Sequence, residues 1–479
     1  MESIWQKSCK IEKRKSLHGD INVDVAVIGA GMAGILTAYK LGQEGFNVVV
    51  VEASRTASGQ SAKTTAKITA QHGAIYSRLT EKFGLEKAKQ YARANLSALD
   101  EYRKIIAEKS IQCDFEEKDS YIFSLDDSEK MKKEAFACTN LGMNAEFLPS
   151  AESLPFPVAG CVRLKNQAQF NPLKFIFSLS KEIKIYENTP VLSVGNDTLT
   201  TPNGRIKAKH IVHACHYPFV NFPGMYFIKM HQERSYILAL QGAKEVGAMF
   251  IDADHGISLR DYNGAVLLGG AAHRTGENSL SGRYEKLEKT ARSLFPDSRI
   301  IAKWSAQDCM TADEVPYIGR FSRLKENHYV ATGFQKWGMT TSMAAAQIIT
   351  DMICGRHNEN AEVFSPSRFS FSALSQITKQ SGQALKGIAR QNLSFPKEQL
   401  DSIPKGHGGV VRYKGKQAGV YKDENGKIFA VDTRCPHLGC RLEWNGDEKS
   451  WDCPCHGSRF DYTGKLIDNP AQASCKRIE

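Results

Sequence analysis

The sequence lacks any apolar run that approaches the roughly 20 residues of a membrane-spanning helix. Residues 1–20 include the basic run Lys10–Lys15 but neither an apolar signal core nor a twin arginine. These absences predict no membrane span and no secretory signal. We therefore expect a cytoplasmic protein.

Basic segments interleaved with aromatic residues are also absent. Lys and Arg number 63 against 52 Asp and Glu, which gives a net charge of +11, but both signs are spread along the chain. Nucleic-acid binding is therefore not expected. A mildly basic surface suits an anionic substrate or an acidic electron-transfer partner. At 479 residues, the chain predicts about two to four domains.

Cysteines are not scarce, and their distribution is uneven. In a cytoplasmic protein most of the 12 cysteines would be reduced thiols, unless some of them bind metal. Seven are scattered singly between Cys9 and Cys354, whereas four fall between Cys435 and Cys455. The second group indicates a metal site near the C-terminus.

A dinucleotide site is predicted near the N-terminus. Residues 23–28 form an apolar run that is typical of a buried parallel strand, and Val48–Val51 form a second one. Between them lie three glycines followed by a helical pattern, and the second run ends at an acidic residue: Gly29, Gly31, Gly34 and Glu52. Such glycines allow a tight turn, approach of a pyrophosphate and close helix packing, and the acid accepts bonds from the ribose. This motif alone does not separate FAD from NAD.

Later segments favour FAD by resemblance. Residues 190–218 predict a hairpin turning at Asn203–Gly204 and then a buried strand, and residues 331–353 predict a strand, a glycine turn and a helix. With Tyr317-Ile318-Gly319 and residues 58–73, these segments resemble the D-amino-acid-oxidase-like superfamily of flavoproteins. The resemblance covers residues 23–355. It implies FAD binding by Gly29, Gly31, Gly34, Glu52, Gly333 and Gly338.

The substrate side departs from that superfamily. Many of its amino-acid oxidases carry an Arg just before the Thr-x-Asp segment, but here residues 307–310 precede Thr311-Ala312-Asp313 and include no Arg. A plain α-amino acid is therefore not the expected substrate. His72, Tyr236 and Lys336 are candidate pocket residues, and core packing or contact with the flavin remains open for each.

The C-terminal residues carry a Cys-x-His pair and a Cys-x-x-His pair: Cys435, His437, Cys453 and His456. Two thiolates and two imidazoles fit a Rieske-type [2Fe–2S] cluster, whereas zinc ribbons usually use Cys-x-x-Cys pairs. Leu438-Gly439 and Gly457-Ser458 complete the resemblance to Rieske proteins. Their respiratory and photosynthetic members imply a disulfide between Cys440 and Cys455.

The order of these parts resembles a bacterial family of FAD-dependent oxidoreductases with a C-terminal Rieske domain. The predicted fold is an α/β FAD-binding Rossmann-type domain with an interleaved α+β substrate domain, plus a small all-β Rieske domain. We expect an N-terminal extension over 1–22, the FAD-dependent oxidoreductase domain over 23–365, a linker over 366–405 and the Rieske domain over 406–479. A turn at residues 424–426 is expected within the last domain.

These parts predict a dehydrogenase. A small amine or N-methylated amine would give a hydride to the flavin, which can pass electrons singly to the cluster and then to an external one-electron carrier. Two alternatives stay open: a reductase fed by a ferredoxin-like donor through the cluster, and an electron-transfer or redox-sensing protein without a substrate. A pocket open to solvent at the flavin would disfavour the last.

Overall fold

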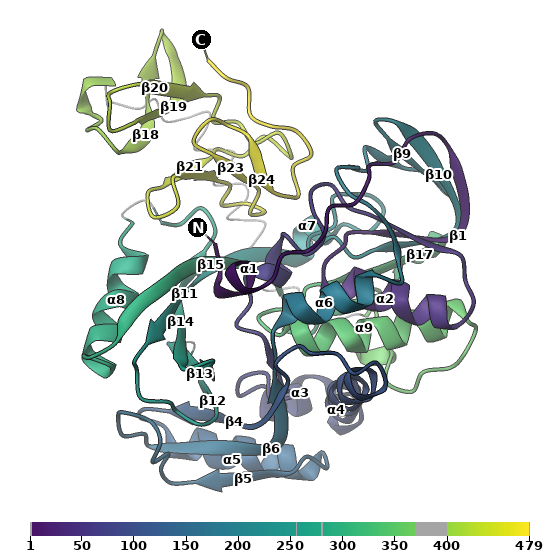
Figure 1. The fold of residues 1–479 in the computed structure, drawn as a ribbon, viewed down its shortest axis with the longest axis vertical. Coiled ribbons are helices and arrows are strands. Elements are labelled where there is room, and N and C mark those ends of the chain that lie inside the picture. Colours follow the sequence, from purple (N-terminus) through teal and green to yellow (C-terminus); the bar gives the residue numbers. More distant parts are fainter. Residues whose placement is uncertain (1, 255, 279–280, 369–399, 479) are drawn as a thin grey trace.

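The computed structural model of the protein describes residues 2–254, 256–278, 281–368 and 400–478. Two large sheets form the lower part of the molecule in Figure 1, and two small sheets of C-terminal residues lie above them. The predicted linker over 366–405 falls mainly outside the described residues.

The first large sheet is built around the segment with the glycine motif. In it β1 (Ile21–Ile28) pairs in parallel with β2 (Val48–Val51) on one side and with β10 (Gly204–His213) on the other. The main path is β16-β17-β10-β1-β2-β7, with β16 antiparallel to its neighbour. The other strands are β7 (Lys184–Tyr186), β8 (Ser193–Val194), β9 (Thr198–Thr201), β16 (Tyr317–Ser322) and β17 (Lys325–Thr332).

Local sequence explains this sheet. The valines of β2 are almost entirely buried, as expected for a parallel strand covered on both faces. The hairpin predicted at Asn203–Gly204 is confirmed by the antiparallel pairing of β9 with β10, in which Gly204 lies opposite Thr201. The predicted late strand and helix are confirmed as β17 and α9 (Gly338–Ile353).

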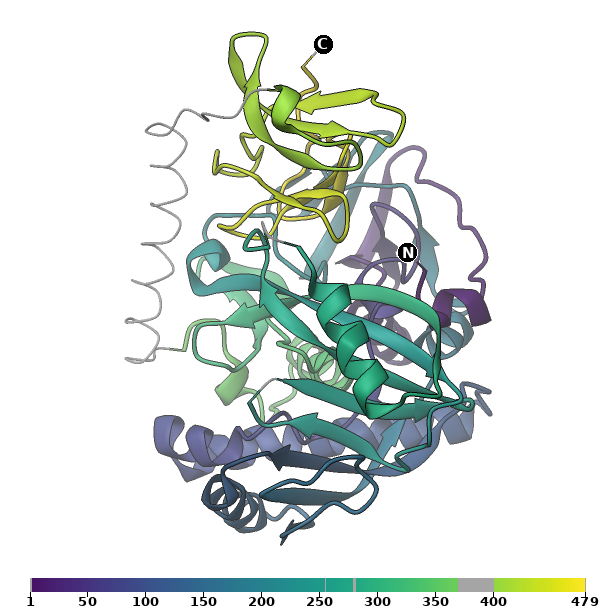
Figure 2. The ribbon, with the colours of Figure 1, turned by 90° about the vertical axis from the view of Figure 1, so that its left-hand side faces the viewer.

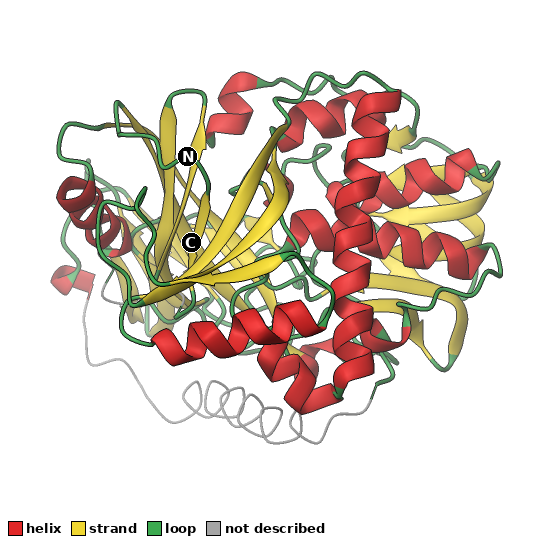
Figure 3. Ribbon diagram, turned by 90° about the horizontal axis from the view of Figure 1, so that it is seen from below, coloured by secondary structure: helices red, strands yellow, loops and turns green. Residues whose placement is uncertain are grey.

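Helices pack around and between the two large sheets, as Figure 3 shows from below. The buried helix α9 packs against α2 (Met32–Gln43) and against the long helix α4 (Leu85–Glu108). Three consecutive buried alanines from Ala344 to Ala346 keep α9 narrow at this contact. The other α-helices of the described residues are α1 (Ile4–Ser8), α3 (Tyr76–Phe83), α5 (Ser128–Asn140), α6 (Pro172–Ser180), α7 (Tyr226–Lys229) and α8 (Arg283–Leu294). Among the described residues, no helix has both the length and the apolar character needed to cross a bilayer.

The second large sheet has the order β15-β11-β14-β13-β12-β4-β6-β3, and β5 pairs with β6. Helix α8 packs on β11 and β14, across the front of the sheet in Figure 2. The strands of this second sheet are β3 (Lys67–Ile68), β4 (Glu116–Ser124), β5 (Ala145–Leu148), β6 (Gly160–Gln169), β11 (Met230–Gln241), β12 (Met249–Asp252), β13 (Ile257–Tyr262), β14 (Ala265–Arg274) and β15 (Arg299–Thr311). Because these strands alternate along the chain with those of the first sheet, the predicted interleaved α+β substrate domain is confirmed.

The C-terminal residues form two small antiparallel sheets, so the predicted all-β part is also confirmed. The first contains β18 (Gly408–Tyr413), β19 (Lys416–Lys422) and β20 (Ile428–Val431). The second contains β21 (Glu443–Asn445), β22 (Ser450–Asp452), β23 (Arg459–Asp461) and β24 (Leu466–Asp468). The loops with the paired cysteines and histidines lie between β20 and β21 and between β22 and β23.

Candidate functional site

The glycine motif forms a tight turn between β1 and α2. Gly29 has a φ of +105°, and a Cβ there would lie 2.6 Å from the Ala214 carbonyl oxygen. A Cβ on Gly34 would lie 1.9 Å from the Gly29 carbonyl oxygen. Position 29 therefore needs a glycine, both because of its positive φ and because the Ala214 carbonyl leaves no room for a side chain. The lack of a side chain at Gly34 lets α2 lie close to the turn.

The Glu52 carboxylate lies beside this turn, directly after β2. It accepts hydrogen bonds from the backbone N–H groups of Ala30 and Ser54, both at 2.9 Å. Burial raises the pKa of Glu52, and these backbone donors act in the opposite direction. The glycine turn and the acid thus have the mutual placement that a dinucleotide requires.

One large cavity of about 900 Å³ extends from this turn to the start of α9. Gly29, Gly31, Glu52 and Gly338 line it, whereas Gly34 and Gly333 do not. Gly333 is needed for packing, because a Cβ there would lie 2.3 Å from Thr311 Cγ2. The cavity is at the upper end of the volumes typical of cofactor and ligand sites.

Lys336 lines the cavity within a half-buried group of opposite charges. Its Nζ lies 3.0 Å from Ser235 Oγ, 3.2 Å from Glu233 Oε2 and 3.6 Å from Asp308 Oδ2. Burial by itself lowers the pKa of Lys336, but the two carboxylates outweigh it and raise that pKa. Tyr236 also lines the cavity, and its hydroxyl lies 3.0 Å from His273 Nε2.

Lys67 is a second lysine on the cavity wall, and its side chain is buried. Its Nζ has two long contacts with hydroxyls, at 3.4 Å to Thr65 and 3.3 Å to Ser258. Burial and, to a smaller extent, the positive charge of Arg260 lower the pKa of Lys67 to about 7. Arg260 donates to the carbonyls of Thr65 and Ala66, both at 2.8 Å, and so fixes the segment that carries Lys67.

His72 is placed differently from the other two pocket candidates. It does not line the cavity, and its ring stacks on Trp337 at a centroid distance of 4.9 Å. Its Nδ1 lies 2.7 Å from the Tyr91 hydroxyl and its Nε2 lies 2.8 Å from the Thr69 carbonyl oxygen. Burial lowers the pKa of His72 to about 3. His72 is therefore a neutral imidazole with both nitrogens hydrogen-bonded, and it packs behind Trp337, which lines the cavity.

The two Cys–His loops have the same backbone turn. In the first, Cys435 N–H donates to the Cys440 carbonyl (2.8 Å) and Gly439 N–H to the Cys435 carbonyl (2.9 Å). In the second, Cys453 N–H donates to Ser458 (2.8 Å) and Gly457 N–H to Cys453 (2.9 Å). Each turn has a glycine in the left-handed region, at φ +79° and +80°. The repeated turn brings Cys435 and Cys453 together. A hydrogen bond with the Cys453 thiol lowers the pKa of the Cys435 thiol.

The two histidines of these loops face each other, with ring centroids 4.9 Å apart and planes at 90°. Burial lowers the pKa of His437 to about 4 and that of His456 to about 3, so both imidazoles are neutral. Within the described part of the chain, the Nδ1 atoms of both are buried without a hydrogen-bond partner. His437 Nε2 donates to Asn221 Oδ1 at 2.9 Å, which leaves the Nδ1 lone pair available. These residues fit an iron site with two imidazole and two thiolate ligands.

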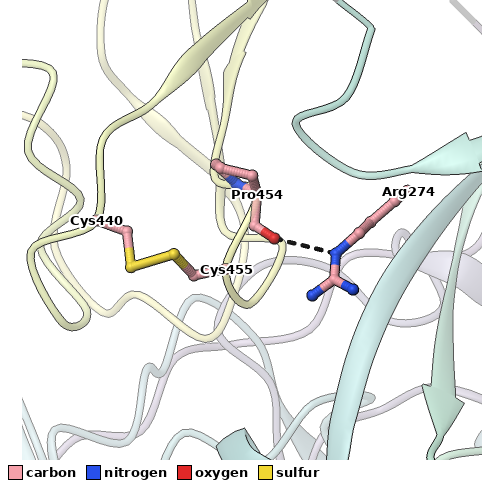
Figure 4. Close-up of a disulfide and its surroundings, with 4 residues drawn as sticks. All are labelled: Arg274, Cys440, Pro454 and Cys455. Atoms are coloured by element: carbon pink, nitrogen blue, oxygen red, sulfur yellow. Dashed lines mark hydrogen bonds between the residues drawn. A yellow bond between two sulfur atoms is a disulfide. The ribbon is translucent and has the colours of Figure 1, made fainter. Parts of the chain in front are cut away.

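A disulfide joins the same two loops. It connects Cys440 with Cys455 over a Cα–Cα distance of 6.5 Å, the pairing that the resemblance implies. Figure 4 shows the neighbouring Pro454, whose carbonyl oxygen accepts a hydrogen bond from Arg274 Nε at 3.2 Å. The second loop therefore touches the flavin-domain strand β14 next to the disulfide.

Two glutamines connect the second loop with β11 and β15. Gln232 Nε2 donates to the His456 carbonyl (2.7 Å), and Gln307 Nε2 donates to the Gly457 carbonyl (2.7 Å). A Cβ on Gly457 would lie 2.6 Å from Gln232 Cβ, so the loop is in tight contact with β11. Gln307 also lines the large cavity. A single residue thus touches both candidate cofactor sites.

A buried ion-pair network crosses the same interface. Arg234, on β11, donates to Glu448 through Nε at 2.9 Å, and Arg459 lies 3.1 Å from the same carboxylate. Arg459 also pairs with Asp452 and Asp468, each at 3.0 Å. The Arg234 side chain is completely buried. These opposite charges pair with one another away from water. Because Arg234 belongs to the flavin domain and the other members belong to the C-terminal domain, the complete network forms only when the two domains are docked.

Several of these residues gave no local sequence signal. Gln232, Gln307 and Arg234 lie on ordinary strands, and only the pairing of β11 with β15 and the packing of distant loops gives them their roles. Lys67 could have been noticed, because it lies within residues 58–73, one of the segments that carry the resemblance to the flavoproteins.

Comparisons with known proteins agree with this arrangement. Residues 24–352 match the family described as FAD dependent oxidoreductase, and residues 395–479 match the Rieske [2Fe-2S] domain. The chain is 36% identical over 499 aligned residues to the Rieske 2Fe-2S iron–sulfur protein YhfW of Bacillus subtilis (strain 168), with 100% of this chain and 97% of that protein covered.

Solved structures share the fold of the larger part. L-proline dehydrogenase from P. horikoshii has a TM-score of 0.63 at 19% identity, covering 74% of this chain and 98% of that one. Glycine oxidase from Geobacillus kaustophilus has a TM-score of 0.62 at 17% identity, covering 73% of this chain and 99% of that one. At such identities, the likeness is one of fold.

Proposed function

Because the chain belongs to the FAD-dependent oxidoreductases, in a form that adds a Rieske [2Fe–2S] domain, we propose that it is a dehydrogenase of a small amine or N-methylated amine. Oxidation removes a hydride and a proton from the C–N unit and leaves an imine. The two electrons would then pass, one at a time, through a cluster held by the two Cys–His loops to an external one-electron carrier. Bound FAD supplies the acceptor that converts two-electron into one-electron chemistry.

The cluster ligands in this proposal are Cys435, Cys453, His437 and His456. The support is their chemistry and placement: two buried thiols side by side and two neutral imidazoles whose Nδ1 atoms have no hydrogen-bond partner among the described residues. The FAD ligands are the backbone of the Gly29–Gly31 turn, Glu52 and the start of α9 at Gly338, which share one cavity.

The cavity supports a small substrate. Lys67 and Lys336 line it with amino groups that can bind or exchange protons, whereas the Tyr236 side chain is fully buried against His273 and Tyr284. A cavity of this kind disfavours a purely electron-carrying flavoprotein. The names of the solved structures give L-proline and glycine as the compounds on which those proteins act. Both compounds contain a C–N bond, which favours an amine as the substrate here. The Arg that clamps the substrate carboxylate in many α-amino-acid oxidases is absent from residues 307–310, which disfavours a plain α-amino acid.

Gln307 carries the argument for the internal electron route. It lines the cavity and donates to Gly457 in the second cluster loop at 2.7 Å. Gln307 therefore connects the cavity that would hold a flavin with the loop that would hold the cluster. Fusion in one chain keeps the two groups at a high effective concentration.

An external carrier can approach the other side of the cluster site. Leu438, next to His437, is 41% exposed, and Phe222, next to Asn221, is 67% exposed. Asn221 is the residue that accepts the hydrogen bond from His437. These apolar side chains leave one edge of the first cluster loop open to a partner, whereas the second loop is covered by β11.

An anaerobic titration tests the proposal. The purified protein would be mixed with amines, N-methylated amines and hydroxy acids, while flavin bleaching is followed optically and the reduced cluster by electron paramagnetic resonance. We expect one amine or N-methylated amine to bleach the flavin and to raise the cluster signal with it. Gln307→Leu, which keeps the side-chain size but cannot donate, should leave flavin bleaching unchanged and slow the rise of the cluster signal.

Other results would replace the proposal. Reduction by a hydroxy acid and by no amine would refute the substrate class. If no compound reduced the flavin but a reduced ferredoxin did so through the cluster, electrons would run inward and the protein would be a reductase. Bleaching of the flavin without any cluster signal would contradict the internal route.

A further inference from the structure

A short segment of the C-terminal domain forms part of the dinucleotide cavity. Seven of the eight residues from Lys465 to Gln472 line it, together with Gly29, Glu52 and Ser54 of the first sheet. The family match to the FAD dependent oxidoreductases ends at residue 352, more than a hundred residues earlier. The cavity wall therefore includes residues that lie outside the flavin domain.

Hydrogen bonds hold this segment against the dinucleotide turn. Asn469 Nδ2 donates to the carbonyls of Cys215 at 3.0 Å and Tyr217 at 2.6 Å. The Cα of Cys215 lies 3.0 Å from the position that a Cβ on Gly29 would occupy, so Asn469 is bonded next to the glycine turn. The turn and the segment are thus parts of one wall.

Two further bonds attach the segment to other loops of the cavity. Gln472 Nε2 donates to the Val191 carbonyl at 3.3 Å, and Asp468 Oδ1 accepts from Gln60 Nε2 at 3.1 Å. Val191 and Gln60 line the cavity as well. The segment therefore spans three separate loops that surround the predicted position of the adenosine and pyrophosphate.

The same segment is bonded to the second cluster loop. Ala471 N–H donates to Ser458 Oγ at 3.0 Å, and the Asn469 carbonyl accepts from Gln232 Nε2 at 3.2 Å. Gln232 also donates to His456. A movement of this loop away from the flavin domain would draw the segment away from the cavity.

We infer that the segment Lys465–Gln472 is a functional part of the FAD site: the docked Rieske domain retains FAD by covering its dinucleotide half. The coupling is reciprocal, because a ligand that binds better when the domains are docked also strengthens the docking. This inference concerns cofactor retention and does not depend on the substrate or on the direction of electron flow.

Release of FAD from the full-length holoprotein tests it, since free FAD is more fluorescent than bound flavin in most flavoproteins. Asn469→Ala removes two hydrogen bonds and should speed FAD release by about tenfold or more. Gln472→Ala removes one bond from an exposed side chain and should speed release by a few-fold. Asn425→Ala, in the turn between β19 and β20, should leave the release rate unchanged.

The cluster spectrum separates this effect from a loss of the domain fold. In Gln472→Ala, the electron paramagnetic resonance signal of the reduced cluster should be that of the unaltered protein while FAD release is faster. Release at the unaltered rate in both Asn469→Ala and Gln472→Ala would overturn the inference. If Asn469→Ala did not fold, Gln472→Ala alone would decide, since its side chain is exposed and has a single bond.

Discussion

At the scale of single residues, Lys67 is a cavity group whose pKa lies in the physiological range. Burial and the charge of Arg260 lower its pKa to about 7, and its Nζ faces the hydroxyls of Thr65 and Ser258. Above pH 7 the neutral amine can take a proton from a cationic substrate. We expect flavin reduction by the amine to rise as the pH increases through about 7.

Two variants check this role of Lys67. Lys67→Met lacks the base and Lys67→Arg stays charged at every accessible pH, so both should lose the rise in rate near pH 7. The measurement is the rate of anaerobic flavin bleaching at saturating substrate between pH 5.5 and 9. A rise at the same pH in Lys67→Met would show that another group is responsible.

The proposed cluster ligands are a second prediction at this scale. Cys453→Ser removes one thiolate, so the protein should lose its bound iron and its electron paramagnetic resonance signal. The matched control is Cys475→Ser, because Cys475 is also buried in the C-terminal domain and lies outside the proposed ligand set. A full cluster signal in Cys453→Ser would refute the ligand assignment.

At the scale of elements, the two cluster loops differ in their surroundings and not in their turns. Gly439 and Gly457 have nearly the same φ, but a Cβ on Gly439 meets nothing within 4 Å, while one on Gly457 would overlap Gln232. Alanine at either position has a similar conformational cost. Only Gly457→Ala should push its loop away from β11.

Electron transfer between flavin and cluster distinguishes the two alanine variants. Gly457→Ala should slow reduction of the cluster by reduced flavin, since the loop moves away from Gln232 and Gln307. Gly439→Ala should transfer electrons at nearly the unaltered rate. Equal rates in the two variants would mean that contact of the second loop with β11 is not the route. Cluster content and FAD content must both be matched before the rates are compared.

Local patterns predicted the elements that carry the cofactors. The turn at Gly29 and the acid Glu52 follow from strand and helix periodicity, and the cysteine–histidine pairs follow from ligand chemistry. The same patterns could not reveal Gln307 or the segment Lys465–Gln472. These residues gain their roles from contacts between positions hundreds of residues apart, for which a strand or a turn has no local signature. His72, a candidate by its neighbourhood, has both nitrogens occupied by groups that the sequence could not identify.

At the scale of the whole molecule, the domains are joined through buried charges. Burial alone would raise the pKa of Glu448, but Arg234 and Arg459 outweigh it and lower the pKa to about 2. A carboxyl with a lowered pKa in the folded protein contributes stability that is present above its ordinary pKa of 4.5. That contribution is lost as the pH falls towards 2.

Removal of one partner should be costly. Arg234→Met leaves a buried carboxylate with fewer partners and should lower the free energy of unfolding by roughly 3–5 kcal/mol. The double variant Arg234→Met/Glu448→Met removes both charges and should recover part of this loss. Urea unfolding at pH 7 measures both values, and an Arg234→Met protein as stable as the unaltered one would contradict the role of the network. The acid sensitivity of the double variant between pH 4.5 and 2 should also be smaller.

Internal electron transfer is the central claim of this account, and photoreduction of the flavin by light, with EDTA as the sacrificial electron donor, in the sealed, oxygen-free holoprotein tests it most directly. No substrate or external carrier is present, so electrons can reach the cluster only through the protein. We predict that the electron paramagnetic resonance signal of the reduced cluster appears as the flavin is reduced, at a rate independent of protein concentration. A flavin that becomes fully reduced while the cluster stays oxidised would contradict the claim.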